Sequence, residues 1–145
     1  LREELAAGGT GEPDPREIAK AVRRLRRRNL PDPATVRNAG TFFKKPVMSE
    51  KLAGSLNAEQ PAMPVLPAAP GMRKLSAAGL IEACGWRGYR EGDAGVSRQH
   101  ALVLVNHGTA TGRELLDLAR RVAASVSERF SVRLEPEPRI VGEEF

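Results

Sequence analysis

The sequence contains few of the residues on which several common protein classes depend. Cys84 is the only cysteine, which excludes an intramolecular disulfide and a thiolate metal site and favours a reducing compartment. Aromatic residues make up only 4% of the chain, too few for the stacking surfaces that bind single-stranded nucleic acid. No apolar run approaches the ~20 residues of a membrane-spanning helix, and the N-terminal residues show no signal-peptide pattern. We therefore expect a cytoplasmic protein without a nucleic-acid or membrane partner.

The composition is that of a folded domain. The chain has 145 residues, of which 41% are hydrophobic and 28% are charged. A chain of this length buries roughly 70% of its extended surface on folding. Lysine and arginine number 23 against 18 aspartates and glutamates, which gives a net charge of +5. This positive balance favours anionic ligands without identifying one.

The first strong structural signal is a helix that begins after Asp14. Asp14 can cap this helix, Pro15 suits its first position, and Glu17 has the spacing of a capping box. Apolar residues recur at helical intervals, namely Ile18, Val22 and Leu25. The prolines within residues 29–33 end the helix. The five arginines within residues 23–28 predict a solvated helix face, with a nucleic-acid contact as the alternative.

The rest of the chain alternates between helices and short strands. Ser49 begins a short helix to about residue 56, and Ser76 begins another that ends at Gly85. Four prolines predict an extended loop over residues 60–71, and residues 87–97 predict turns with a short strand.

The C-terminal part supplies the expected sheet. Residues 101–106 (ALVLVN) predict its central strand, and residues 130–134 and 138–141 predict two further strands. Thr111 and Glu114 predict the capping box of a helix with its core-facing residues at Leu115, Leu118, Val122 and Val126. We expect an α+β fold, a small sheet with helices packed on one face.

No spacing of residues indicates a catalytic or metal site by itself. His100 and His107 lack the spacing of metal ligands, so we expect a strand-end and a loop histidine. Cys84 lies on an apolar helix face and is expected to be a buried, inert thiol. The glycines of residues 8–11 lack the flanking residues of a phosphate loop and indicate a linker.

Residues 38–46, which read NAGTFFKKP, resemble a known signature. It is the N-A-G-S-F-F-K-N-P of UDP-N-acetylenolpyruvoylglucosamine reductases, the MurB family of flavoenzymes in peptidoglycan synthesis. The similarity continues in register through LPDP, KLSAA, RGYREGDAGV, QHALVLVN and LEPEPRIVG, which begin at residues 30, 74, 87, 99 and 134. It covers residues 15–142, and the order of the motifs identifies the chain as a member of this family.

The resemblance implies a reaction and two catalytic residues. In this family NADPH reduces bound FAD, and the flavin transfers a hydride to UDP-N-acetylglucosamine enolpyruvate, which becomes UDP-N-acetylmuramate. The proton-donating hydroxyl corresponds to Thr41, where the family usually has serine, and the acid that protonates or stabilises the enol corresponds to Glu137. Burial would keep such a carboxyl protonated, and Gly40 would allow close approach of the substrate.

Other positions correspond to substrate contacts, several with departures from the family pattern. Lys45 replaces an asparagine and could meet the diphosphate, and His100 stands where glutamine or histidine contacts the substrate. Asn29 replaces a lysine, with Arg28 adjacent, and Leu66 replaces an aromatic residue that closes over the ligand. The alternative is therefore a diverged, non-catalytic UDP-sugar binding module.

The family enzymes are longer than this chain, which implies a division of the sequence. Residues 1–30 would be the tail of an FAD-binding domain and its linking helix. Residues 31–136 would be the substrate-binding C-terminal domain, and residues 137–145 would return toward the N-terminal domain. FAD would be bound mainly by that N-terminal domain, the partner in the full-length enzyme. We expect this chain to be inactive alone.

Overall fold

The structure, a computed structural model, describes residue 3, residue 5 and residues 14–145. Residues 8–11, which we expect to form a linker, lie outside the described residues. Over the described part of the chain, the helices and strands form an α+β fold with two small antiparallel sheets where we expected one. This confirms the predicted fold class.

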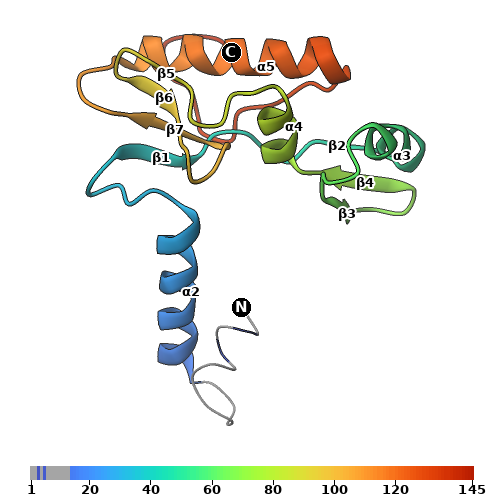
Figure 1. The fold of residues 1–145 in the computed structure, drawn as a ribbon, viewed down its shortest axis with the longest axis horizontal. Helices are drawn as coiled ribbons and strands as arrows, with labels where there is room; N and C mark the ends of the chain where they lie inside the picture. Colours follow the sequence, from blue (N-terminus) through green and yellow to red (C-terminus); the bar gives the residue numbers. More distant parts are fainter. Residues whose placement is uncertain (1–2, 4, 6–13) are drawn as a thin grey trace.

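A four-stranded antiparallel sheet forms the centre of the fold. Its strand order is β1 (Arg37–Thr41), β7 (Val103–Asn106), β6 (Ala94–Val96) and β5 (Arg90–Glu91). β7 lies between β1 and β6, which confirms the central strand predicted within residues 101–106. Helix α5 (Gly112–Phe130) lies across one face of this sheet (Figure 1).

The core between α5 and the sheet follows the predicted helical periodicity. Leu118, Val122 and Val126 are buried and belong to one cluster with residues of the sheet, namely Ala94, Val96 and Leu104. Burial of each such aliphatic side chain contributes about 1.5–3 kcal/mol. The helix begins at the predicted capping box, in which Thr111 Oγ1 accepts from the Glu114 amide at 3.2 Å.

Two strands predicted near the C-terminus are absent from the structure. Residues 131–134 belong to no strand, since Ser131 has the left-handed backbone (φ 54°) that ends α5, and residues 138–141 form no strand either. Val132 and Leu134 are nevertheless buried, so the alternation that predicted a strand reflects packing against the core. Pro136 makes only an isolated bridge with Phe43, because proline has no N–H with which to extend a ladder.

A second, three-stranded sheet lies beside the first (Figure 1). Its order is β2 (Val47–Ser49), β4 (Met72–Leu75) and β3 (Val65–Pro67). The loop predicted over residues 60–71 is therefore wrong at residues 65–67. β3 is an edge strand, where proline is tolerated because one side of the strand needs no hydrogen bonds.

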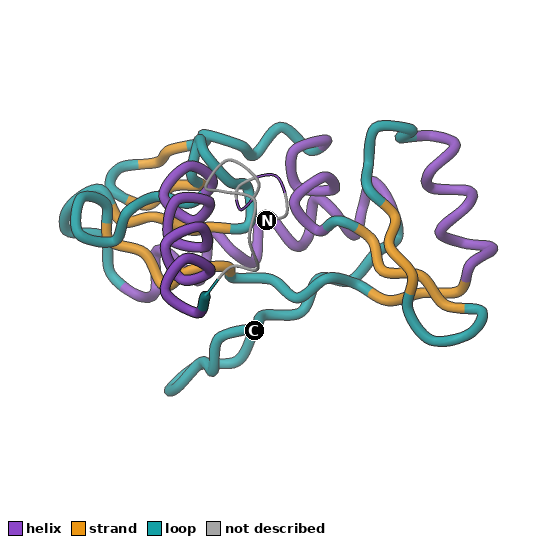
Figure 2. Tube along the Cα trace, turned by 90° about the horizontal axis from the view of Figure 1, so that it is seen from below, coloured by secondary structure: helices purple, strands orange, loops and turns teal. Residues whose placement is uncertain are grey.

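Within residues 14–145, three other helices begin at their predicted caps. They are α2 (Pro15–Asn29) after Asp14, α3 (Glu50–Glu59) after Ser49 and α4 (Ala77–Ala83) after Ser76. α2 projects from the sheet face opposite α5 (Figures 1 and 2). Its apolar stripe is partly exposed, because Ile18 and Val22 are each 38% exposed and Leu25 is half-buried. No helix in the described residues has the length and apolar character to cross a membrane.

Candidate functional site

Thr41 and Glu137 meet although 96 positions separate them in the sequence. Thr41 Oγ1 donates a hydrogen bond to Glu137 Oε2 at 3.0 Å. The backbone holds the two segments together, because the Glu137 amide donates to the Phe42 carbonyl at 2.7 Å. Thr41 is half-buried and Glu137 is exposed. The Glu137 carboxyl is therefore not buried in the described chain, and both groups are open to a ligand.

The direction of Thr41 depends on a β-bulge in β1. Asn38 pairs with Val105 and Thr41 pairs with Val103, so between these pairs β1 advances three residues while β7 advances two. Residues that pair across strands point to the same face, as do residues two apart on one strand. The extra residue thus places Thr41 on the same sheet face as Asn38, the face opposite α5. Gly40, within the bulge, has φ +81°, which glycine adopts without strain.

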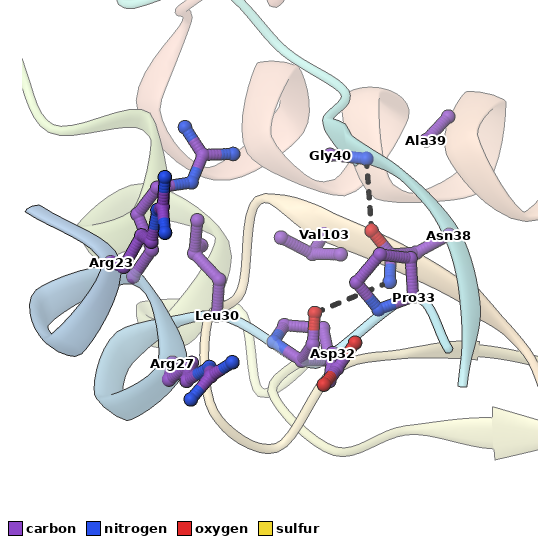
Figure 3. Close-up of a pocket in the computed structure, with 11 residues that line it drawn as sticks. Arg23, Arg27, Leu30, Asp32, Pro33, Asn38, Ala39, Gly40 and Val103 are labelled. Atoms are coloured by element: carbon purple, nitrogen blue, oxygen red, sulfur yellow. Dashed lines mark hydrogen bonds between the residues drawn. The ribbon is translucent and has the colours of Figure 1, made fainter. Parts of the chain in front are cut away.

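The side chain of Asn38 holds this bulge. Its Oδ1 accepts from the Gly40 amide at 3.0 Å (Figure 3), and its Nδ2 donates to the carbonyls of Val36 at 2.8 Å and Pro31 at 3.4 Å. Sequence reasoning did not single out Asn38. The pattern that could have pointed to Asn38 is an asparagine two residues before a glycine, because an asparagine side chain often hydrogen-bonds to the backbone two residues further on.

A groove of about 530 Å³ opens on this face, between α2 and strands β1 and β7 (Figure 3). Val103 and Gly40 line it from the sheet, and the loop before β1 contributes residues 30–33. Three residues of the arginine run also line it, namely Arg23, Arg26 and Arg27. These arginines are exposed, as the prediction of a solvated helix face requires, and they also border the groove. Guanidinium groups beside apolar side chains suit an anionic ligand.

His100 and Lys45, two further predicted ligand residues, lie close enough to interact electrostatically, but neither lines the groove. His100 is half-buried, and its Nδ1 accepts from the Leu102 amide at 3.3 Å. Burial lowers the pKa of His100, the carboxylate of Glu82 opposes this shift, and nearby cations including Lys45 add to it. Lys45 is exposed and has no hydrogen-bond or ion-pair partner among the described residues. Its ammonium group is therefore available to a ligand.

The remaining predicted ligand residues, Arg28, Asn29 and Leu66, do not line the groove. Arg28 and Asn29 are exposed at the end of α2, and the groove is lined by their neighbours instead. Leu66 lies on edge strand β3 of the second sheet and is 41% exposed. The structure thus joins Thr41 to Glu137 by a hydrogen bond, whereas β3, the strand that carries Leu66, lies in the other sheet (Figure 1).

The described residues hold no group of three or more His, Cys, Asp or Glu that could bind a metal ion. His107 is exposed at the end of β7. Cys84 is half-buried rather than buried, and its thiol contacts the Ser125 carbonyl at 3.6 Å.

Comparison with known proteins identifies the family. Residues 32–141 match the family model described as the C-terminal domain of UDP-N-acetylenolpyruvoylglucosamine reductase. The chain belongs to this family. This confirms the resemblance carried by residues 38–46, and the matched range includes Thr41, Lys45, His100 and Glu137, whereas Arg28 and Asn29 precede it.

Curated reductases of this name resemble the chain closely. The protein of Xylella fastidiosa (strain 9a5c) is 56% identical over 146 residues, which cover 100% of this chain and 42% of the relative. That of Xanthomonas euvesicatoria pv. vesicatoria (strain 85-10) is 58% identical over 143 residues, or 98% of this chain and 41% of the relative. The chain thus spans about two-fifths of the length of these relatives.

A solved reductase of this family, MurB from Thermus caldophilus, is also similar. Its crystal structure matches at 30% identity with a TM-score of 0.49, over 84% of this chain and 33% of the solved one.

Proposed function

We propose that the chain is the substrate-binding part of a cytoplasmic reductase that converts UDP-N-acetylglucosamine enolpyruvate to UDP-N-acetylmuramate in peptidoglycan synthesis. The observation that carries this proposal is the hydrogen bond of 3.0 Å between Thr41 and Glu137. It joins a hydroxyl and a carboxyl on an open face, beside a groove lined by arginines. Both residues lie in the range that matches the reductase family.

The reaction adds one hydride and one proton across a carbon–carbon double bond. FAD, reduced by NADPH, would supply the hydride. Hydride addition at one carbon leaves negative charge on the other carbon and on the adjoining carboxylate, and a proton must reach that carbon. The half-buried hydroxyl of Thr41 is the group proposed to deliver it, at hydrogen-bond distance.

Glu137 is proposed to support the same step. In its protonated form Glu137 can return a proton to Thr41 and can donate a hydrogen bond to the negative charge of the enol form. Its backbone bond to Phe42 holds it beside the threonine. Gly40 leaves open space, since an added Cβ would meet no atom within 4 Å, so a substrate can approach the backbone there.

The substrate's diphosphate is proposed to meet Lys45, His100 and the cations at the end of α2, Arg28 among them. Asn29 and Leu66 remain proposed contacts, and Leu66 would need the second sheet or the ligand to approach. The unpartnered Lys45 and the arginines of the groove support the choice of an anionic ligand.

The division of the sequence is likewise a proposal. Residues 1–30 would end a flavin domain, residues 31–136 would bind substrate, and residues 137–145 would return toward the flavin domain. The greater length of the relatives supports this, because the described residues supply only part of such an enzyme. FAD would be held mainly by the additional residues of the full-length protein.

The test uses the longest native protein that contains this sequence. Its flavin is bleached with NADPH under anaerobic conditions, and the enolpyruvyl UDP-sugar is then added. Return of the yellow oxidised flavin supports the proposal. A flavin that bleaches and does not recover overturns it in favour of a diverged binding module.

A further inference from the structure

Asn38 uses its whole side-chain amide on backbone groups of its own neighbourhood. One hydrogen bond joins it to the Gly40 amide inside the bulge (Figure 3), and two join it to the carbonyls of Pro31 and Val36. The side chain is half-buried. It therefore joins two segments, the bulge of β1 and the loop of residues 30–36 that leads from α2.

This loop lies against the sheet face that carries Thr41. Pro31 is buried and borders two hollows of that face, the groove over Val103 and a neighbouring cleft of about 410 Å³ over Val105. Asn38 pairs with Val105 in the sheet and bonds to Pro31 above it. Its amide group thus fixes the loop to the sheet between the two hollows.

The bulge determines which way Thr41 points. Without the extra residue, Thr41 and Asn38 would lie on opposite faces of the sheet, and the hydroxyl would point toward α5. The bond from the Gly40 amide to Asn38 Oδ1 lies immediately before Thr41. On the other side, the Phe42 amide donates to the Leu102 carbonyl at 2.7 Å. The backbone of Thr41 is consequently fixed on both sides, by the hydrogen bond to the Asn38 side chain before it and by the backbone hydrogen bond to Leu102 after it.

We infer that Asn38 is a positioning residue, which holds the β1 bulge so that the Thr41 hydroxyl faces Glu137 and the substrate. This inference rests on the proposed function, because the position of the Thr41 hydroxyl affects the rate only if Thr41 delivers the proton. A displacement of about 1 Å can slow a reaction by about a hundredfold. Asn38 acts through Thr41 and need not touch the substrate.

The substitution Asn38→Asp tests the inference with little change in shape. It keeps an oxygen for the Gly40 amide but replaces the donor to Pro31 and Val36 with a carboxylate oxygen that faces two carbonyls. Asn38→Ser, which is smaller and uncharged, serves if the aspartate variant does not fold. The matched control is Asn106→Asp, because Asn106 also binds only backbone, accepting from Gly108 and Ala110 and donating to Ala110 at 2.6 Å.

The first measurement separates the two halves of the reaction in the full-length protein. Asn38→Asp should leave flavin reduction by NADPH unchanged and should slow flavin reoxidation by the enolpyruvyl UDP-sugar about tenfold or more. The control Asn106→Asp should change neither rate by more than about twofold. Reoxidation as fast in Asn38→Asp as in the control would overturn the inference, while activity of the unsubstituted protein would still support the proposed function.

A double-mutant cycle then asks whether Asn38 acts through Thr41. In a Thr41→Val background, Asn38→Asp should slow reoxidation no further, whereas independent effects would multiply and contradict the inference.

If the enolpyruvyl UDP-sugar does not reoxidise the flavin of the unsubstituted protein, the proposed function fails by itself. Amide hydrogen exchange then tests whether Asn38 holds the β1 bulge. The Gly40 amide should exchange faster in Asn38→Asp than in the Asn106→Asp control, and equal exchange rates would overturn the claim that Asn38 holds the bulge.

Discussion

Substitution of two glycines by alanine should change stability in opposite directions. Gly40 has φ +81° and open space around an added Cβ, so the whole cost of Gly40→Ala is backbone strain. An L-residue in that region costs about 1–2 kcal/mol. Gly54 lies inside α3 with open space and no positive φ, so Gly54→Ala should stabilise by about 0.5–1 kcal/mol.

Thermal unfolding of the 145-residue chain measures both effects. One kcal/mol corresponds to roughly 3–4 °C in Tm for a chain of this size. We expect Gly40→Ala to lower Tm by roughly 3–8 °C and Gly54→Ala to raise it by roughly 2–4 °C, from the same estimates. Equal stability of Gly40→Ala and the unsubstituted chain would refute the bulge geometry from which the direction of Thr41 is argued.

Three further changes test the helix ends and the titration of His100. Thr111→Ala should destabilise by about 1 kcal/mol because it removes the capping oxygen of α5, and urea unfolding measures the loss. Ser131→Gly should raise Tm by a few degrees, since Ser131 ends α5 with φ 54°; an unchanged Tm would argue against this cap. The pKa of His100 is lowered from 6.5 in the folded chain, so the unfolded chain binds more protons and stability should fall as the pH drops through 6.5. His100→Asn should reduce that slope between pH 5 and pH 7, and an unaltered slope would show that other groups cause it.

The helices could be predicted from sequence because their ends are encoded locally. Asp14, Ser49, Ser76 and Thr111 each accept a hydrogen bond from the third residue of the helix that follows. These contacts depend on residues within one turn, so spacing alone reveals them. What sequence did not reveal is the exposure of the α2 stripe, because periodicity shows that a face is apolar and not whether anything covers it.

The strands were predicted less well because pairing depends on distant partners. β7 is a continuous apolar run and could be recognised, whereas Pro64 before β3 and Pro67 at its end made that strand look like a loop. Val132 and Leu134 alternate like a strand and are buried, but they belong to no strand. Alternation therefore predicted burial correctly and hydrogen bonding wrongly.

The candidate site could be predicted in part. The family signature pointed to Thr41 and Glu137, and the structure joins them by a hydrogen bond. The bulge that orients Thr41 could not be predicted, because it is a mismatch of register between β1 and β7. The part played by Asn38 follows from that mismatch, so it became visible only in the fold.

The most direct test of the account is flavin reoxidation by the enolpyruvyl UDP-sugar in full-length protein that carries Thr41→Val, with Thr41→Ser as the matched variant. Valine keeps the shape of threonine without its hydroxyl, so reoxidation should slow by about a hundredfold or more while flavin reduction by NADPH stays unchanged. Serine keeps the hydroxyl and should stay within about tenfold of the unsubstituted rate. Reoxidation of the valine variant at the unsubstituted rate would contradict the assignment of Thr41 as the proton donor.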